Sequence, residues 1–106
     1  MKRFFDLADV NRERQEGGRL YQEFLRIPAM SAGMYVLPAG APDPQRPHRQ
    51  DEMYYVVRGR ARMRVGSEDQ EVKAGMVIFV DAGLEHRFFD IDEELHVLVF
   101  FAPAET

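Results

Sequence analysis

The sequence predicts a small all-β protein, a sandwich or barrel of short strands that follows a short N-terminal arm or helix. Strand-like segments recur at a spacing of roughly 8–12 residues, and clusters of Gly, Pro and Asp separate them. The chain has 106 residues, which is enough for one domain with its own core. We therefore expect an N-terminal arm over residues 1–19 and a single β domain over residues 20–106.

The N-terminal segment favours a helix, and the rest of the chain favours strands. Residues 6–16 are polar, with Leu7 and Val10 between charged residues, and Gly17-Gly18 ends this segment. Four prolines and one glycine make residues 38–47 an irregular loop. The predicted strands cover residues 20–27, 32–37, 52–57, 60–65, 70–73, 76–80, 86–89 and 95–101.

The segment 60–65 alternates strictly between arginine and apolar residues. Its three arginines therefore lie on one face of a strand and its apolar residues on the other. Residues 66–69 predict a hairpin turn, and the return strand places Glu71 opposite the arginine face. We interpret the arginines as a solvent-exposed face with acidic cross-strand partners rather than as a phosphate-binding stripe.

The composition excludes several classes of protein. Fourteen Lys and Arg against eighteen Asp and Glu give a net charge of −4, so no nucleic-acid partner is expected. No apolar run approaches the ~20 residues that span a bilayer, and Asp6 and Asp9 interrupt the N-terminal apolar segment. Neither a membrane partner nor a signal peptide is therefore expected. The chain has no cysteine, which removes disulfides and thiolate ligands and makes a cytoplasmic location the default expectation.

The histidines are the first candidates for chemistry, and the chain has three of them, His48, His86 and His96. His48 and Glu52 have the same parity, so an extended chain points both side chains to one face. His86 begins a later strand and can approach from the opposite wall. Two imidazoles and one carboxylate form a facial set that holds a divalent metal such as non-haem iron and leaves coordination positions open. The alternative is that His48 and His86 are surface loop residues beside charged neighbours.

Two motifs in this sequence resemble those of the cupin family. The first cupin motif contains His-x-His, then a Glu and a closing Gly at fixed spacing, and the matching residues are His48, Glu52 and Gly59. The second motif runs Gly, five residues, Pro-x-Gly, two residues, His, and the matching residues are Gly75, Gly83 and His86. The resemblance covers roughly residues 31–103.

This resemblance implies an antiparallel jelly-roll barrel that holds a divalent metal ion (Fe, Mn, Ni or Zn) inside. The implied metal ligands are His48, Glu52 and His86. Arg46 stands where the family has its first motif histidine, so one of four family ligands is missing. Gln45 is either an alternative source of a ligand oxygen or an ordinary loop residue.

Three further residues are candidates for substrate binding. Arg46 either points outward as a loop charge or leans over the barrel mouth and clamps an anionic group of a substrate. Tyr54 shares the parity of Glu52, and Phe88 shares that of His86, so both are expected on the inner face as core or as pocket wall. His96 interrupts an apolar strand and is expected at an outward or edge position.

The resemblance implies two alternative functions for a metal-binding cupin. One is a metal-dependent enzyme that acts on a small polar molecule, through a dioxygenase-like oxidoreductase reaction or as an isomerase or decarboxylase. The other is a non-catalytic protein that binds or senses a small-molecule ligand. The apolar strand 95–101 and the apolar residues Leu25 and Ile27 exceed what one barrel needs, and with the resemblance they predict a homodimer.

Overall fold

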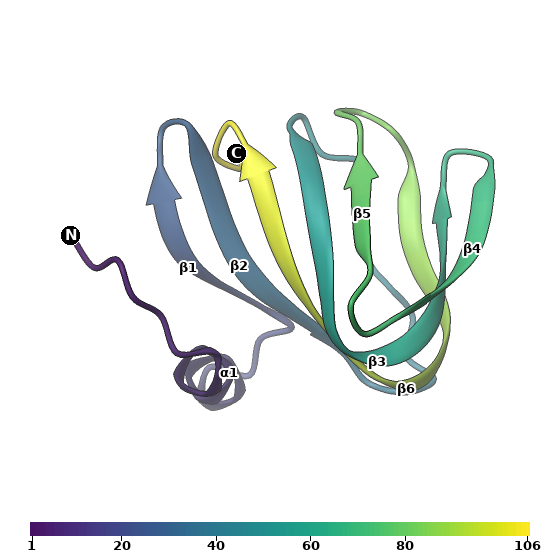
Figure 1. Ribbon diagram of the computed structural model, residues 1–106, viewed down its shortest axis with the longest axis horizontal. Coiled ribbons are helices and arrows are strands. Elements are labelled where there is room, and N and C mark those ends of the chain that lie inside the picture. The colour runs from purple at the N-terminus through teal and green to yellow at the C-terminus, as the bar shows by residue number, and fades with distance from the viewer.

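The strands form one antiparallel sheet that curves into a barrel (Figure 1). The computed structural model describes all 106 residues. Neighbouring strands follow the order β1-β2-β6-β3-β4, and β5 pairs with β3. The all-β fold with one short N-terminal helix is therefore confirmed. The elements are α1 (Leu7–Glu16), β1 (Tyr21–Ile27), β2 (Met30–Leu37), β3 (Asp51–Val65), β4 (Glu68–Lys73), β5 (Val77–Val80) and β6 (His86–Ala102).

Two long strands replace four of the shorter strands that the sequence predicts. The break expected at Gly59 lies inside β3, where φ is 101° and the pairing register with β6 shifts. The gap expected over residues 90–94 lies inside β6, where Asp90 has a φ of 47°. Both expected breaks are wrong because such irregularities bend and twist a strand without ending its hydrogen bonding. The bends let β3 and β6 pair along two walls of the barrel.

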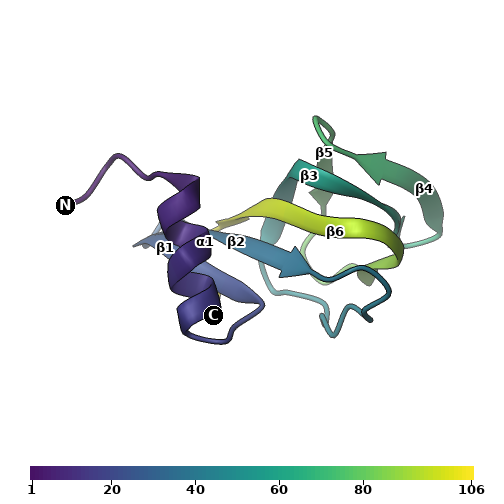
Figure 2. The ribbon, with the colours of Figure 1, turned by 90° about the horizontal axis from the view of Figure 1, so that it is seen from below.

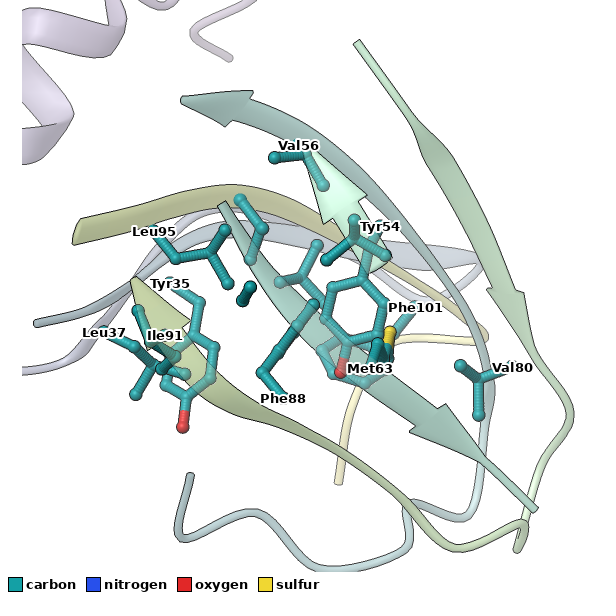
Figure 3. Close-up of a cluster of buried hydrophobic side chains, with 14 residues drawn as sticks. Tyr35, Leu37, Tyr54, Val56, Met63, Val80, Phe88, Ile91, Leu95 and Phe101 are labelled. Atoms are coloured by element: carbon teal, nitrogen blue, oxygen red, sulfur yellow. The ribbon is translucent and has the colours of Figure 1, made fainter. Parts of the chain in front are cut away.

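A cluster of 14 buried side chains fills the barrel interior (Figure 3). Along β3, Tyr54 and Val56 are buried, whereas Met53 and Tyr55, which alternate with them, are exposed. This alternation is the period-2 pattern of a strand with one face on the core. The ring of Phe88 from β6 packs edge-to-face on Tyr54 with ring centroids 5.2 Å apart. The core therefore fixes β3 and β6 against each other beside the polar groups described below.

Helix α1 covers the outer face of the sheet at the β1–β2 edge (Figure 2). The carboxylate of Asp6 caps its N-terminus by accepting a hydrogen bond from the backbone N–H of Ala8 at 2.9 Å. Val10 packs on Met34 and Val36 of β2. The helix is ten residues long, and no helix in the chain has the length and apolar character needed to cross a membrane.

The arginine face of β3 has the acidic partners that the sequence predicts. Arg62 and Arg64 each lie within 3.1 Å of the Asp69 carboxylate on β4. Arg60 approaches Glu71 at 3.9 Å, and the backbone pairing sets Glu71 opposite Arg62. The interpretation as a neutralised, solvent-exposed face is confirmed.

The proline-rich segment between β2 and β3 is irregular, as predicted, and it is tied to the barrel at two points. The backbone carbonyl of His48 accepts a hydrogen bond from the N–H of Gly83 at 2.7 Å. The carboxylate of Asp43 accepts hydrogen bonds from the Tyr35 hydroxyl at 2.7 Å and from the Phe88 N–H at 2.9 Å. These ties hold the loop against the start of β6 and bring its polar side chains to the barrel interior.

Candidate metal centre

The structure brings His48, Glu52 and His86 together. Glu52 lies near the start of β3, and His86 pairs with Val65 at the far end of the same strand. Nε2 of His86 lies 2.8 Å from Oε1 of Glu52, and Nε2 of His48 lies 3.9 Å from that oxygen. One ligand atom from each of the three residues lies within 4.8 Å of the other two. The separate walls of the barrel therefore deliver two imidazoles and a carboxylate to one point.

The cluster is buried, and three of its polar atoms lack hydrogen bonds. The side chains of Glu52 and His86 are 1% and 0% exposed, whereas that of His48 is 19% exposed. Neither carboxylate oxygen of Glu52 has a hydrogen-bond partner, nor has Nε2 of His86. The 2.8 Å contact between Glu52 and His86 is close enough for an ion pair but is not aligned as a hydrogen bond. A buried carboxylate in this state is costly unless a cation compensates it.

Both imidazoles turn their Nε2 atoms toward Glu52 because their Nδ1 atoms have other partners. Nδ1 of His86 lies 2.9 Å from the backbone carbonyl of Leu84. Nδ1 of His48 lies 3.1 Å from the carboxylate of Glu105, near the C-terminus. A carbonyl or carboxylate oxygen accepts the Nδ1 proton, which leaves Nε2 with a free lone pair in the neutral ring. This arrangement is typical of metal-binding histidines.

Burial and the charge of Glu52 shift the pKa values of two groups at the cluster, His86 and Tyr54. Burial lowers the pKa of the His86 imidazole, but the adjacent Glu52 carboxylate and Leu84 carbonyl outweigh it, and the net pKa is raised. Burial, and then the charge of Glu52, raise the pKa of the Tyr54 hydroxyl well above its ordinary value. Tyr54 therefore keeps its proton and donates a hydrogen bond to Oε1 of Gln45 at 2.7 Å.

The other predicted site residues are placed differently. Arg46 is exposed on the loop, and its contact with a substrate stays a prediction. Tyr54 and Phe88 are completely buried in the core and do not line the cavity beside the cluster, so their contact with a ligand also stays a prediction. His96 lies on the face of β6 opposite the core, which is the outward direction that the sequence predicts, but it is buried there and hydrogen-bonds to Glu94. An edge position is wrong, because β6 pairs with β2 and with β3 at this residue.

Glu105 and Asp43 escape analysis of the sequence, which names Gln45 only as one of two alternatives, a source of a ligand oxygen or an ordinary loop residue. Glu105 comes from the C-terminal tail, which is held by a hydrogen bond of its N–H to the Ser31 hydroxyl at 2.9 Å. Asp43 and Gln45 lie in the proline-rich loop, where no periodicity shows which side chains turn inward. Only the closeness of Gln45 to the motif residues gives a signal, and it leaves the side-chain direction open.

A cavity of about 180 Å³ opens beside the cluster. Its walls are mainly aromatic and apolar, with Gln45, His48 and Glu105 on the side of the cluster. The hydroxyl of Tyr21 is buried there without a hydrogen-bond partner. Burial, together with the charge of Glu105, raises the Tyr21 pKa, so this hydroxyl remains a donor. An engineered apolar cavity of about 150 Å³ holds benzene, so the volume suits a molecule of roughly six to ten non-hydrogen atoms.

Comparisons with known proteins agree with the fold and the motifs. A family model described as a cupin domain matches residues 33–101. The chain is 47% identical over 102 residues to the uncharacterized protein SCO3923 of Streptomyces coelicolor, covering 96% of this chain and 97% of that protein. The structure of TT1209 from Thermus thermophilus matches with a TM-score of 0.77 at 25% identity, covering 97% of this chain and 99% of that one. BH2720 from Bacillus halodurans matches with a TM-score of 0.79 at 16% identity, covering 97% and 82%, which shows the fold alone.

Proposed function

The chain belongs to the cupin domain family, and we propose from this premise that it is a metal-dependent cupin whose ion is held by His48, Glu52 and His86. The observation that carries the proposal is the buried Glu52 carboxylate, whose two oxygens have no hydrogen bond and which two imidazole Nε2 atoms approach. A divalent cation satisfies all three groups at once, and three protein ligands leave open positions.

The protein's own residues prepare the place where a substrate meets the metal. A bound ion there supplies a Lewis acid with open coordination positions. His48 lies between the cluster and the cavity, so a molecule in the cavity reaches the metal past this side chain. The Tyr21 hydroxyl donates a hydrogen bond to a polar group of that molecule, and the aromatic walls exclude water from it. Arg46, on the exposed loop, is the proposed contact for an anionic group that extends out of the cavity.

We propose a dioxygenase-like oxidoreductase reaction on a small polar molecule as the activity, with isomerisation or decarboxylation as the alternative chemistries. The small size of the cavity and the open metal positions support a small-molecule substrate. The net charge of −4 supports a small molecule over a nucleic acid as the partner. The absence of cysteine is the basis for a cytoplasmic location, which fractionation of cells that express the chain would test.

A second candidate function is non-catalytic binding of a small ligand. The observation that favours it is the depth of the cluster, since Glu52 and His86 are almost completely buried and only His48 is accessible. A metal in such a place anchors a ligand while the protein surrounds most of the ion. Oxygen consumption by the Fe(II)-loaded protein distinguishes the two functions when small dicarbonyl, thiol and phenolic compounds are supplied. Binding without turnover across this panel supports the non-catalytic function.

The metal content of the purified and reconstituted protein is the direct test of the proposal. We expect about one divalent ion per chain, and His86→Ala should reduce the affinity by at least about tenfold. His96→Ala is the matched control, because it removes a buried imidazole from the opposite face of the same strand. Equal losses in the two variants would mean that the ligand set is wrong.

We also propose a homodimer that forms through the outer face of β3, β5 and β6. Met53 pairs with Phe79 on one side and Phe100 on the other, and Tyr55 pairs with Val77. All of these side chains except Phe100 are exposed although they are large and apolar. A contiguous exposed apolar face is uncommon on a monomer. Sedimentation velocity should give a dimer for the natural chain and a monomer for Phe79→Glu.

A further inference from the structure

Gln45 occupies a place in the cluster that no sequence motif assigns to it. Its Oε1 lies 3.3 Å from Nε2 of His48, and that Nε2 is the atom that faces Glu52. The same oxygen accepts the hydrogen bond from the Tyr54 hydroxyl at 2.7 Å. A carbonyl oxygen has two lone pairs, so the Tyr54 bond leaves one of them free. The amide of Gln45 therefore offers an oxygen ligand at the edge of the three-residue cluster.

Asp43 fixes the direction of the Gln45 amide. Nε2 of Gln45 donates a hydrogen bond to Oδ2 of Asp43 at 2.7 Å, and the backbone N–H of Gln45 donates to Oδ1 at 3.2 Å. A carboxylate only accepts hydrogen bonds, so the amide nitrogen must face Asp43 and the amide oxygen must face the cluster. Asp43 is itself held by the hydrogen bonds from Tyr35 and Phe88. The oxygen is thus oriented before any ion binds.

When both imidazoles are neutral and carry their proton on Nδ1, acceptors face acceptors at this point of the barrel. Nδ1 of His48 lies 3.1 Å from the Glu105 carboxylate, and in the neutral ring protonated at Nδ1 the Nε2 lone pair points toward the Gln45 oxygen 3.3 Å away. The Nδ1 proton of His86 is used by Leu84, so its Nε2 lone pair lies beside the Glu52 carboxylate. With both rings neutral, the His48 lone pair faces the Gln45 oxygen, the His86 lone pair faces the Glu52 carboxylate, and Nε2 of His48 lies 3.9 Å from Oε1 of Glu52. A cation among the four resolves the mutual repulsion of these lone pairs.

We infer that Gln45 is the fourth protein ligand of the metal and that Asp43 is its positioning residue. The inference rests on the proposed metal function and goes beyond the motif residues, which supply three ligands and have Arg46 at the fourth position. An amide oxygen is neutral, like a neutral imidazole, so the total charge of the four ligands is the same with Gln45 as with a fourth-ligand histidine. Two nitrogen and two oxygen ligands make the site more favourable to Mn(II) and Fe(II), relative to Cu(II), than three imidazoles and a carboxylate would.

Titration of the full chain with Zn(II) and with Mn(II) tests the inference through affinity. We expect Gln45→Met to weaken binding of each ion by at least about tenfold, which is about 1.4 kcal/mol. Asp43→Asn should weaken it by about 10- to 100-fold, as loss of an orienting partner does, although Asp43 does not touch the ion. Gln70→Met is the matched control, because Gln70 is exposed on β4 and is not one of the cluster residues. This variant should bind both ions as tightly as the natural chain does.

Nuclear magnetic resonance of the natural chain provides a readout that does not depend on the folding of a variant. When diamagnetic Zn(II) is added, the ¹³Cδ and Nε2H₂ resonances of the Gln45 side chain should shift, while those of Gln70 should not. Undiminished affinity in Gln45→Met together with unshifted Gln45 resonances overturns the inference and leaves the three-residue site intact. Failure of the natural chain to bind any ion overturns the proposed function as well.

Discussion

Replacement of Glu52 with glutamine tests whether the buried carboxylate is a metal ligand or stabilises the fold as an ion-pair partner. The side chain of Glu52 is 1% exposed, and neither of its oxygens has a hydrogen-bond partner. A buried polar group without a partner costs about 1–3 kcal/mol, and more when it is charged. Glutamine has the same shape without the charge, and its N–H can donate to Nε2 of His86. Glu52→Gln should therefore raise the free energy of unfolding of the metal-free protein by about 1–3 kcal/mol.

Urea and thermal denaturation at pH 8 with a chelator present measure this change. For a domain of this size, 1 kcal/mol corresponds to roughly 4–8 °C in Tm. Metal should then reverse the order of stability, because an ion at about 1,000 times its Kd stabilises the natural chain by about 4.1 kcal/mol and should have little effect on the variant. Glu68→Gln, at an exposed position of β4, is the control and should change neither value. A metal-free Glu52→Gln protein that is less stable than the natural chain would refute the reasoning, since the carboxylate would then be a structural ion-pair partner of His86.

Three further predictions concern the fold. Phe88→Ala removes a completely buried ring and should lower the free energy of unfolding by about 3–5 kcal/mol in urea; a loss under 1 kcal/mol would mean that the core is not packed as described. Gly59→Ala should cost at least about 1–3 kcal/mol, because φ is 101° and a Cβ would overlap the Glu94 carbonyl; a neutral result would contradict the bulge. Arg64 and Arg62 lower the pKa of Asp69, so its contribution to stability is present above the ordinary carboxyl pKa and disappears as the pH falls through the lowered value. Asp69→Asn should thus reduce Tm slightly at pH 7 and not at pH 2, and an equal reduction at both pH values would exclude a charge effect.

The sequence predicts most of the elements because each has a local signal. The alternation in 60–65 shows which side chains of β3 lie inside, and Asp6 and Gly17 mark the two ends of α1. The predicted breaks at Gly59 and Asp90 are wrong. In the sequence alone these residues indicate a turn, but their positive φ inside a paired strand only bends the strand. Whether a strand continues past such a residue depends on its partner strand, which is distant in sequence.

The three residues of the metal cluster can be predicted from the sequence, because motif spacing and strand parity agree on them. The residues that hydrogen-bond to or pair with them cannot be predicted from motif spacing or parity. Glu105 reaches His48 only because the C-terminal tail folds back on Ser31, and Asp43 reaches Gln45 only because the proline-rich loop is tied to β6. These contacts join segments without periodicity, so their direction is determined by tertiary structure.

An anomalous-scattering map of crystals grown with Mn(II) or Zn(II) is the most direct test of the metal site. We expect one peak inside the barrel, about 2.0–2.3 Å from Nε2 of His48, Nε2 of His86 and a carboxylate oxygen of Glu52. A barrel without a peak at saturating metal, or a peak that lies away from these three side chains, would contradict the assignment.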